Sequence, residues 1–248
     1  MIYFVGAGPG DPELITVRGR RLLAGAPVVV YAGSLVNPEL LALCRPDAIV
    51  HNSAGMTLEE IVAVMVAAHR EGRDAVRLHT GDPALYGAVR EQMEALEREN
   101  VPYRVVPGVS SFLAAAAAAG LELTAPGVSQ TVIVTRLAGR TAVPEAENLR
   151  TLAATGATLV ILLSVQMIEQ VAAELAAGGL PPDTPVIVVE RASWPDEKVV
   201  RTSLGGVAGR VRDLGIGRTA VIMVGRALGG GAAPSRLYAA DFSHGYRK

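Results

Sequence analysis

A short glycine-rich loop near the start of the chain has the composition of a ligand-binding turn. Residues 6–11 read GAGPGD, between an apolar run and a predicted helix, and such loops bind nucleotide-like ligands in open α/β folds. Pro9 removes one backbone donor, and Asp11 before Pro12 places a carboxylate at the helix N-cap, where a phosphate would bind. The next predicted strand, Val28–Tyr31, ends without the acidic residue that binds ribose in dinucleotide folds. The loop therefore favours a nucleoside-like ligand that carries no phosphate.

Two further loops of related design follow later predicted strands. Residues 80–83 read TGDP, and residues 107–111 read PGVSS. Because the carboxyl ends of parallel strands line the ligand crevice of an open sheet, we expect all three loops to meet there. We expect Asp11 and Asp82 to cap the helices that follow them. Carboxylates and carbonyls suit a cationic, hydroxyl-rich ligand, and S-adenosylmethionine, with its sulfonium and ribose but no phosphate, has that chemistry.

The elements that must position these loops alternate between strand and helix through the first half of the chain. This rhythm predicts a mainly parallel sheet with crossover helices. In the second half, the expected strand Lys198–Ser203 follows the strand ending at Glu190 too closely for a helical crossover, so we expect a mixed sheet. We therefore predict an α/β protein with two α/β domains, residues 1–120 and 121–248, and a ligand cleft between them.

Composition argues against several classes of partner. The formal net charge of -1 gives no general attraction to nucleic acid or to anionic membranes. The four histidines show no metal-ligand spacing with one another or with the single cysteine, Cys44, so we expect no bound metal. The uncharged stretch 151–168 is interrupted by Gly156 and Ser164, which favours a helix end and a buried strand over a membrane span. With one cysteine and no signal-peptide pattern at the amino terminus, we expect a cytoplasmic protein.

Several segments, in order along the chain, resemble the signature of the tetrapyrrole (corrin and porphyrin) methylases. They are VGAGPGDP at 5–12, GDPALYG at 81–87, VPGVSS at 106–111 and VTR at 134–136. Three more resemble members of the family that act on a corrin precursor: YAGSLVNP at 31–38, SAGMT at 53–57 and TRLAGRT at 135–141. Members acting on uroporphyrinogen usually have arginine where Ala88 follows Gly87, so this chain departs from that group. The resemblance implies transfer of a methyl group from S-adenosylmethionine to a carbon of a tetrapyrrole, by a homodimer.

The same resemblance implies a set of binding residues. The implied contacts of S-adenosylmethionine are Pro9, Thr80, Gly81, Asp82, Leu85, Ser110, Ser111, Leu163 and Ala192. For Leu163 and Ala192, a core residue at a strand end and a loop residue are the structural alternatives. A tetrapyrrole substrate carries many carboxylates, so arginines should bind it, and Arg136 and Arg140 are the candidates. A solvated surface position is the alternative for Arg140, and no catalytic base is identified.

The sequence is also compatible with two other classes of function. A nicotinamide-dependent oxidoreductase would also have a strand, a glycine loop and a helix at its start. A non-catalytic tetrapyrrole carrier would also need arginines. A methyltransferase acting on another tetrapyrrole intermediate is a third alternative, within the same family.

Overall fold

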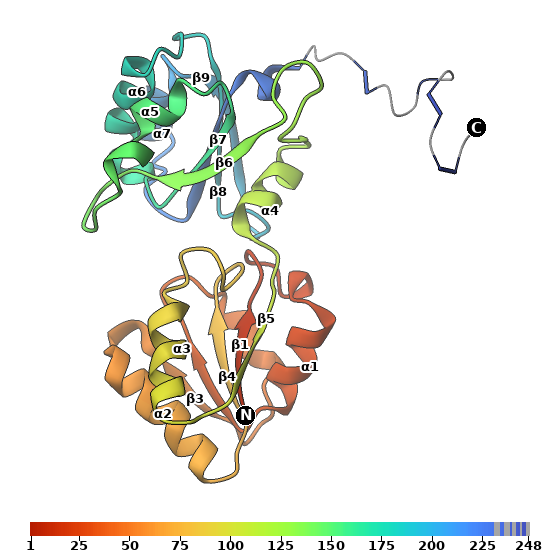
Figure 1. Ribbon diagram of the computed structural model, residues 1–248, viewed down its shortest axis with the longest axis vertical. Helices are drawn as coiled ribbons and strands as arrows, with labels where there is room; N and C mark the ends of the chain where they lie inside the picture. Colours follow the sequence, from red (N-terminus) through yellow and green to blue (C-terminus); the bar gives the residue numbers. More distant parts are fainter. Residues whose placement is uncertain (231–233, 236–238, 240–241, 244, 247–248) are drawn as a thin grey trace. The chain divides into compact units, whose positions relative to one another are not determined.

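The chain folds into two compact units. The computed structural model describes residues 1–230, 234–235, 239, 242–243 and 245–246. Unit 1 comprises Met1–Ala115 together with Arg191–Glu197, and unit 2 comprises the rest of the described chain. Each unit has its own sheet and helices (Figure 1). The predicted domain boundary at residue 120 stays a prediction, and the placement of Arg191–Glu197 in unit 1 has no counterpart among the expectations from sequence.

Unit 1 contains a five-stranded parallel sheet. Its strands are β1 (Ile2–Gly6), β2 (Val28–Tyr31), β3 (Ile49–Asn52), β4 (Ala75–His79) and β5 (Tyr103–Val106). They are ordered β3-β2-β4-β1-β5, and every neighbouring pair is parallel. The predicted parallel sheet is confirmed. Because β1 lies between β4 and β5, the loops that follow these three strands emerge side by side.

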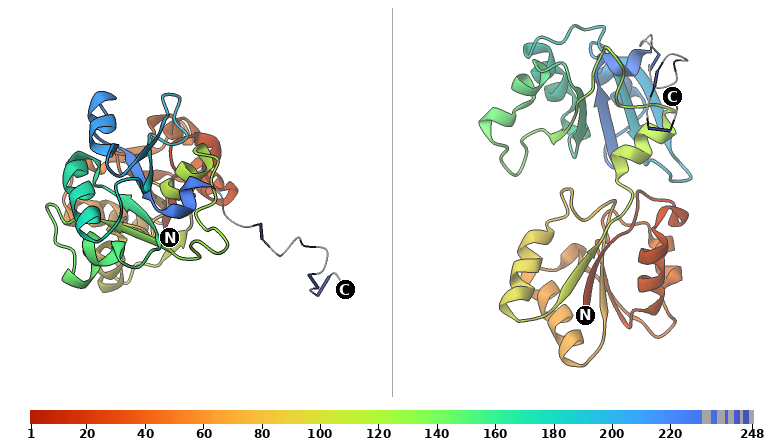
Figure 2. Two further views of the ribbon diagram at one scale, coloured as in Figure 1. Left: turned by 90° about the horizontal axis from the view of Figure 1, so that it is seen from above. Right: turned by 45° about the vertical axis from the view of Figure 1, so that its right-hand side comes forward.

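Helices cover both faces of this sheet. They are α1 (Val17–Gly25), α2 (Leu58–Arg70) and α3 (Val89–Arg98), with 3-10 turns η1 (Pro12–Leu14), η2 (Pro38–Leu43) and η3 (Ser53–Gly55). Side chains of α2 and α3, including Met65 and Leu96, share one core with Phe4, whereas Leu23 of α1 shares another with Val5. Figure 1 and the right-hand view of Figure 2 show α1 on one side of the sheet and α2 and α3 on the other. The alternation of side chains along β1 thus fills two cores.

The two predicted aspartate caps have different outcomes. Asp11 accepts a hydrogen bond from the Glu13 amide at 2.8 Å, so it is a cap, although only of the single turn η1. The prediction that Asp82 caps a helix is wrong, because α3 begins only at Val89. Tyr86 and Ala88 have φ angles of 53° and 47°, and this left-handed backbone cannot continue a right-handed helix.

Unit 2 contains a five-stranded mixed sheet. Its strands are β6 (Val132–Arg136), β7 (Thr158–Leu162), β8 (Pro185–Glu190), β9 (Lys198–Ser203) and β10 (Ala220–Val224), ordered β6-β7-β10-β8-β9. Only β6 and β7 are parallel, so the predicted mixed sheet is confirmed. Three of its helices, α5, α6 and α7, pack their apolar side chains against one face of this sheet. Their bounds are α5 (Leu149–Ala153), α6 (Ile168–Ala177) and α7 (Val207–Asp213), with η4 (Glu145–Glu147), η5 (Val165–Met167) and η6 (Arg226–Gly229).

The remaining helix, α4 (Ser111–Ala118), contains the division between the two units. It is the alanine-rich segment that follows β5, and Gly120 lies just beyond it with a φ of 59°. A glycine in the left-handed region is the usual stop for a helix. Among the described residues, no helix combines the length and the apolar character that crossing a bilayer requires.

Candidate functional site

The three glycine loops of unit 1 meet at the carboxyl ends of β4, β1 and β5. Gly8 and Gly81 exchange two backbone hydrogen bonds, with N···O distances of 2.8 and 3.3 Å. A Cβ atom added to Gly108 would lie 2.1 Å from Gly81 O and 2.8 Å from Gly6 Cα, so the backbones touch with no room for a side chain. We call Gly6, Gly8, Gly81 and Gly108 the glycine crossing. The predicted meeting of the three loops is therefore confirmed.

Asp82 joins two of these loops. Its Oδ1 accepts a hydrogen bond from the Ala84 amide at 2.8 Å, and its Oδ2 accepts one from the Gly108 amide at 2.9 Å. The carboxylate thereby shapes the turn after β4 and holds the loop after β5 against it. With both oxygens engaged by backbone donors, Asp82 is suited to maintaining this geometry more than to transferring a proton.

Thr80 places a buried hydroxyl beside the glycine crossing. Within the described part of the chain, its Oγ1 has no hydrogen-bond partner. A buried hydroxyl without a hydrogen-bond partner costs roughly 1–3 kcal/mol of stability, so a ligand that forms a hydrogen bond with it would bind more tightly. Ser110 and Ser111 are close by, since a Cβ on Gly81 would lie 3.7 Å from Ser110 Cα and 3.5 Å from Ser111 N. The predicted cofactor residues Thr80, Ser110 and Ser111 are thus neighbours of the glycine crossing.

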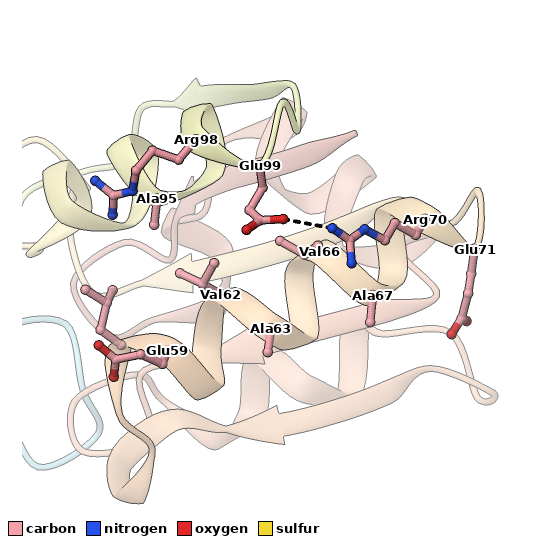
Figure 3. Close-up of a pocket in the computed structure, with 11 residues that line it drawn as sticks. Glu59, Val62, Ala63, Val66, Ala67, Arg70, Glu71, Ala95, Arg98 and Glu99 are labelled. Atoms are coloured by element: carbon pink, nitrogen blue, oxygen red, sulfur yellow. Dashed lines mark hydrogen bonds and ion pairs between the residues drawn. The ribbon is translucent and has the colours of Figure 1, made fainter.

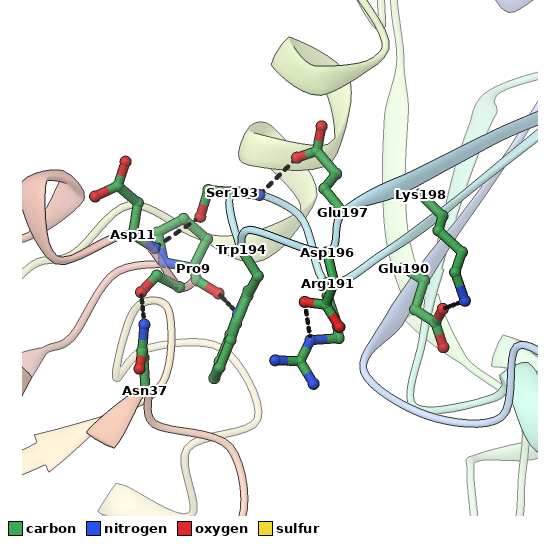
Figure 4. A network of polar contacts seen from close by, with 11 residues as sticks. Pro9, Asp11, Asn37, Glu190, Arg191, Ser193, Trp194, Asp196, Glu197 and Lys198 are labelled. Atoms are coloured by element: carbon green, nitrogen blue, oxygen red, sulfur yellow. Dashed lines mark hydrogen bonds and ion pairs between the residues drawn. The ribbon is translucent and has the colours of Figure 1, made fainter. Parts of the chain in front are cut away.

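The other two predicted cofactor residues of the first half also lie in these loops. Leu85 donates its amide to the Asp82 carbonyl at 3.3 Å, which closes the turn after β4. Pro9 is buried in the first loop, and its carbonyl accepts a hydrogen bond from the Trp194 indole (Figure 4). Ala192 is buried in the same segment as Trp194, in unit 1. The structure thus places eight of the nine predicted cofactor residues in one unit, and their contact with the cofactor stays a prediction.

Leu163 is the ninth, and it lies in unit 2 directly after β7. Its side chain is 64% exposed, and its φ of 56° is in the left-handed region. A bulky residue rarely adopts this backbone conformation, which is often found at functional sites. The alternative interpretation of Leu163 as a core residue is wrong, because the side chain is exposed.

Arg136 and Arg140 belong to one loop of unit 2. The Arg136 guanidinium donates to the carbonyls of Leu137, Thr141 and Ala142 at 3.3, 3.0 and 2.7 Å. It therefore holds the loop at 137–142 in shape and also lines a pocket of about 290 Å³. Arg140 is exposed in that loop, and within the described residues it has no hydrogen bond or ion pair. The exposed Arg140 guanidinium is free to meet a carboxylate, but exposure is also what the alternative of a solvated surface position predicts, so substrate binding by either arginine stays a prediction.

His79 is a buried histidine at the end of β4. Its side chain is 3% exposed, and its Nε2 has no partner within the described chain. Burial, with a smaller contribution from the nearby Arg77 guanidinium, lowers the pKa of His79 from 6.5 to about 3. The ring is therefore neutral at physiological pH.

Replacing His79 by glutamine should change how stability depends on pH. The unfolded chain protonates this ring near its ordinary pKa of 6.5, whereas the folded chain does so only near 3, so its stabilising contribution is complete above about pH 6.5. As the pH falls towards 3 that contribution is lost, by up to about 1.4 kcal/mol per pH unit. Urea unfolding at a series of pH values should show a steeper decline for the wild type than for His79→Gln. Parallel curves would show that His79 does not titrate in this way.

A concave region of unit 1 lies away from the predicted binding residues. A groove of about 660 Å³ runs between α2 and α3, and an ion pair of 2.8 Å joins Arg70 to Glu99 across it (Figure 3). Its other lining residues include Val62, Val66 and Ala95. None of the predicted binding residues lines this groove. Volume alone therefore does not identify the candidate site here.

The sequence did not predict the contacts that Asn37, Ser193 and Trp194 make with the first glycine loop. Asn37 is 4% exposed, and its Nδ2 donates to the Gly10 carbonyl at 2.9 Å. Ser193 and Trp194 contact the same loop from a segment more than 180 positions later in the chain. Of the three, only Asn37 had a local signal, because it precedes Pro38 and caps η2.

Comparison with known proteins relates this geometry to a family. A family model described as Tetrapyrrole (Corrin/Porphyrin) Methylases matches residues 1–208. The cobalt-precorrin-4 C(11)-methyltransferase of Methanocaldococcus jannaschii is 51% identical over 248 residues, which is 100% of this chain and 96% of that protein.

Solved structures of related enzymes have the same fold. The structure of a cobalamin biosynthetic enzyme, cobalt precorrin-4 methyltransferase, is 52% identical with a TM-score of 0.90, covering 92% of this chain and 95% of that one. The uroporphyrin-III C-methyl transferase of Thermus thermophilus, solved with S-adenosyl homocysteine, is 36% identical with a TM-score of 0.78, covering 92% and 98%. Since the family model also spans the glycine crossing and most of unit 2, the chain belongs to the tetrapyrrole (corrin/porphyrin) methylase family.

Proposed function

We propose that the protein transfers the methyl group of S-adenosylmethionine to carbon 11 of precorrin-4, or of its cobalt form, to give precorrin-5 in cobalamin biosynthesis. The protein is an S-adenosylmethionine-dependent C-methyltransferase, and a relative named for the C(11) reaction matches it along its whole length. Within the structure, the glycine crossing carries the proposal. There the three loops that bear the family's motifs are in direct backbone contact.

The loops of unit 1 would hold the methyl donor. Thr80 Oγ1 offers a buried hydroxyl, and Gly81 and Ser110, both buried beside it, would contact the ligand through their backbone with no side chain intervening at the glycine. Asp11 and its cap leave no site for a phosphate, which matches a nucleoside that has none. When bound, S-adenosylmethionine supplies an electrophilic methyl group on a sulfonium. Leu163 and Ala192 complete the proposed set of contacts.

The protein's own contribution is to position the two reactants. An electron-rich ring carbon would attack the methyl group in line with the methyl–sulfur bond, which breaks as S-adenosylhomocysteine leaves with the electron pair. Alignment of the two reactants can supply about 7–11 kcal/mol of the barrier reduction. The internal hydrogen bonds of Asp82 keep the loops rigid while this alignment is held. Burial and a pKa lowered to about 3 make His79 a weak general base, and both oxygens of Asp82 are already engaged, so no residue is assigned to that role.

Replacing Arg140 by alanine should weaken binding of the tetrapyrrole. The substrate's carboxylates would lose one charge-assisted partner, so we expect its KM to rise roughly three- to tenfold while the KM for S-adenosylmethionine stays unchanged. Steady-state kinetics with each substrate varied in turn measures both values. Arg210→Ala, which removes another exposed arginine of unit 2 from α7, is the matched control. Equal effects of the two substitutions would exclude a specific role for Arg140.

Calorimetry and a turnover assay together test the proposed activity. We expect tight binding of S-adenosylhomocysteine and no binding of NAD, whereas the reverse would indicate a nicotinamide-dependent oxidoreductase. A carrier would bind the tetrapyrrole without methylating it. Incubation with S-adenosylmethionine and precorrin-4 should therefore yield a methylated product, and a failure to do so with both the metal-free and the cobalt form would contradict the proposal.

The remaining properties are proposed on family resemblance and composition. We expect a homodimer, which light scattering during gel filtration would test, since a monomeric mass would contradict it. A cytoplasmic location accords with the single cysteine, Cys44, being a free thiol. Cell fractionation tests this location, and recovery of the protein outside the cytoplasmic fraction would contradict it. The expectation that the protein binds no metal of its own stays a prediction.

A further inference from the structure

The segment Arg191–Glu197 holds the first glycine loop by two hydrogen bonds. It lies between β8 and β9 in sequence and belongs to unit 1. Trp194 Nε1 donates to the Pro9 carbonyl at 3.0 Å, and Ser193 Oγ accepts from the Asp11 amide at 3.0 Å (Figure 4). The two bonds fall on either side of Gly10. We call this segment the tryptophan strap.

The indole of Trp194 leaves no room for a side chain at Gly10. A Cβ atom at this position would lie 2.2 Å from both Cδ1 and Nε1 of Trp194. Gly10, unlike Gly8, does not have a positive φ, so backbone freedom does not explain it. The third glycine of the GAGPGD loop therefore serves contact with a side chain of the same protein, and the indole lies directly on the loop.

The loop has little freedom left once the strap is in place. Asn37 Nδ2 donates to the Gly10 carbonyl at 2.9 Å, in addition to the bonds at Pro9 O and Asp11 N. Three backbone polar groups in succession are thus bonded to side chains of the protein. A loop fixed in this way loses little conformational entropy when a ligand binds.

The strap itself is held in an unusual conformation. Arg191 and Ser193 have φ angles of 52° and 67°, a left-handed backbone that is strained for residues other than glycine. The guanidinium of Arg191 lies 4.2 Å from the centre of the Trp194 ring and is paired with Asp196 at 2.8 Å. The Ser193 amide donates to Glu197 Oε2 at 2.6 Å. These contacts offset the strain and fix the direction of the indole.

We propose that Trp194 is a positioning residue of the methyl-donor site: it holds Pro9 and the glycine loop in the shape that binds S-adenosylmethionine. This inference rests on the proposed function. Trp194 is also the single tryptophan of the chain, so its fluorescence reports on the same loop. Adding S-adenosylhomocysteine to the wild type should therefore change the tryptophan emission.

Trp194→Phe tests the inference, because it keeps an aromatic ring and removes the indole donor. We expect the Kd of S-adenosylhomocysteine, measured by calorimetry, to rise roughly three- to tenfold, as for the loss of one hydrogen bond. The KM of the tetrapyrrole should not change, whereas general loss of structure would affect both substrates. Tyr103→Phe is the matched control. Tyr103 begins β5 in the same unit, and the substitution removes the hydrogen bond that its phenol donates to Glu97 while keeping the ring. We expect this variant to bind S-adenosylhomocysteine with unchanged affinity.

Ser193→Ala gives a second test that leaves the indole in place. It removes the acceptor of the Asp11 amide, and we expect a loss of affinity in the same range. If the wild type binds S-adenosylhomocysteine while Trp194→Phe and Ser193→Ala bind it equally tightly, the positioning role is wrong and the proposed function stands. If the wild type does not bind it at all, the proposed function fails as well.

Discussion

Gly108→Ala should abolish tight binding of S-adenosylhomocysteine, with a loss of affinity of about a hundredfold or more. The added Cβ would lie 2.1 Å from Gly81 O and 2.8 Å from Gly6 Cα, and both are backbone atoms that cannot rotate away. The loops after β4 and β5 must then separate at the place where the proposed contacts Gly81 and Ser110 lie. Overpacking of this kind also costs about 1–3 kcal/mol of stability. Calorimetric titration and urea unfolding measure the two effects.

Gly25→Ala is the control for this substitution. Gly25 is exposed at the end of α1, and a Cβ there meets no atom within 4 Å. Alanine is the better helix former, so the variant should be as stable as the wild type or slightly more so. If Gly108→Ala bound S-adenosylhomocysteine as tightly as Gly25→Ala does, the glycine crossing could not be part of the binding site.

Asp82→Asn should lower the affinity for S-adenosylhomocysteine by about ten- to a hundredfold. The two carboxylate oxygens now accept from two amides, those of Ala84 and Gly108. An asparagine has one oxygen and one NH₂ group, so one backbone N–H would face another donor. Leaving that N–H group unpaired costs roughly 1–3 kcal/mol. The side chain would then no longer hold the loops after β4 and β5 together. Calorimetric titration, under conditions where the wild type and the variant are both fully folded, measures the change in affinity.

Asp47→Asn provides the comparison for a carboxylate of the same unit. Asp47 forms an exposed ion pair with Arg45, and exposed pairs contribute about 0–1 kcal/mol. We expect this variant to bind S-adenosylhomocysteine like the wild type. Equal affinities for Asp82→Asn and Asp47→Asn would mean that the link between the β4 and β5 loops has no part in binding.

The main features of the fold were predictable because they depend on local patterns. Short strand-forming runs followed by glycine loops indicated β1, β4 and β5, and the short gap between Glu190 and Lys198 predicted an antiparallel pair. β3 was missed. It is an edge strand whose residues Ile49 and Val50 are 46% and 41% exposed, so it lacks the buried face that makes a strand visible in sequence.

The candidate site was predictable only in part, because its closing contacts join distant residues. The turn chemistry of Gly81 and Asp82 indicated a loop, but the second partner of Asp82, the Gly108 amide, lies 26 positions away. Trp194 lies 185 positions from Pro9, and no local pattern links them. For Arg136, residue type indicated carboxylate binding, whereas its hydrogen bonds to Thr141 and Ala142 depend on the path of the following loop.

The carbon that receives the methyl group gives the most direct test of the proposed function. The protein would be incubated with S-adenosylmethionine carrying an isotopic label in its methyl group, once with precorrin-4 and once with the cobalt form. Mass analysis and carbon NMR of the product should show one added methyl group, labelled, on carbon 11. A product labelled on a different carbon, or no labelled tetrapyrrole from either form, would contradict the proposed function.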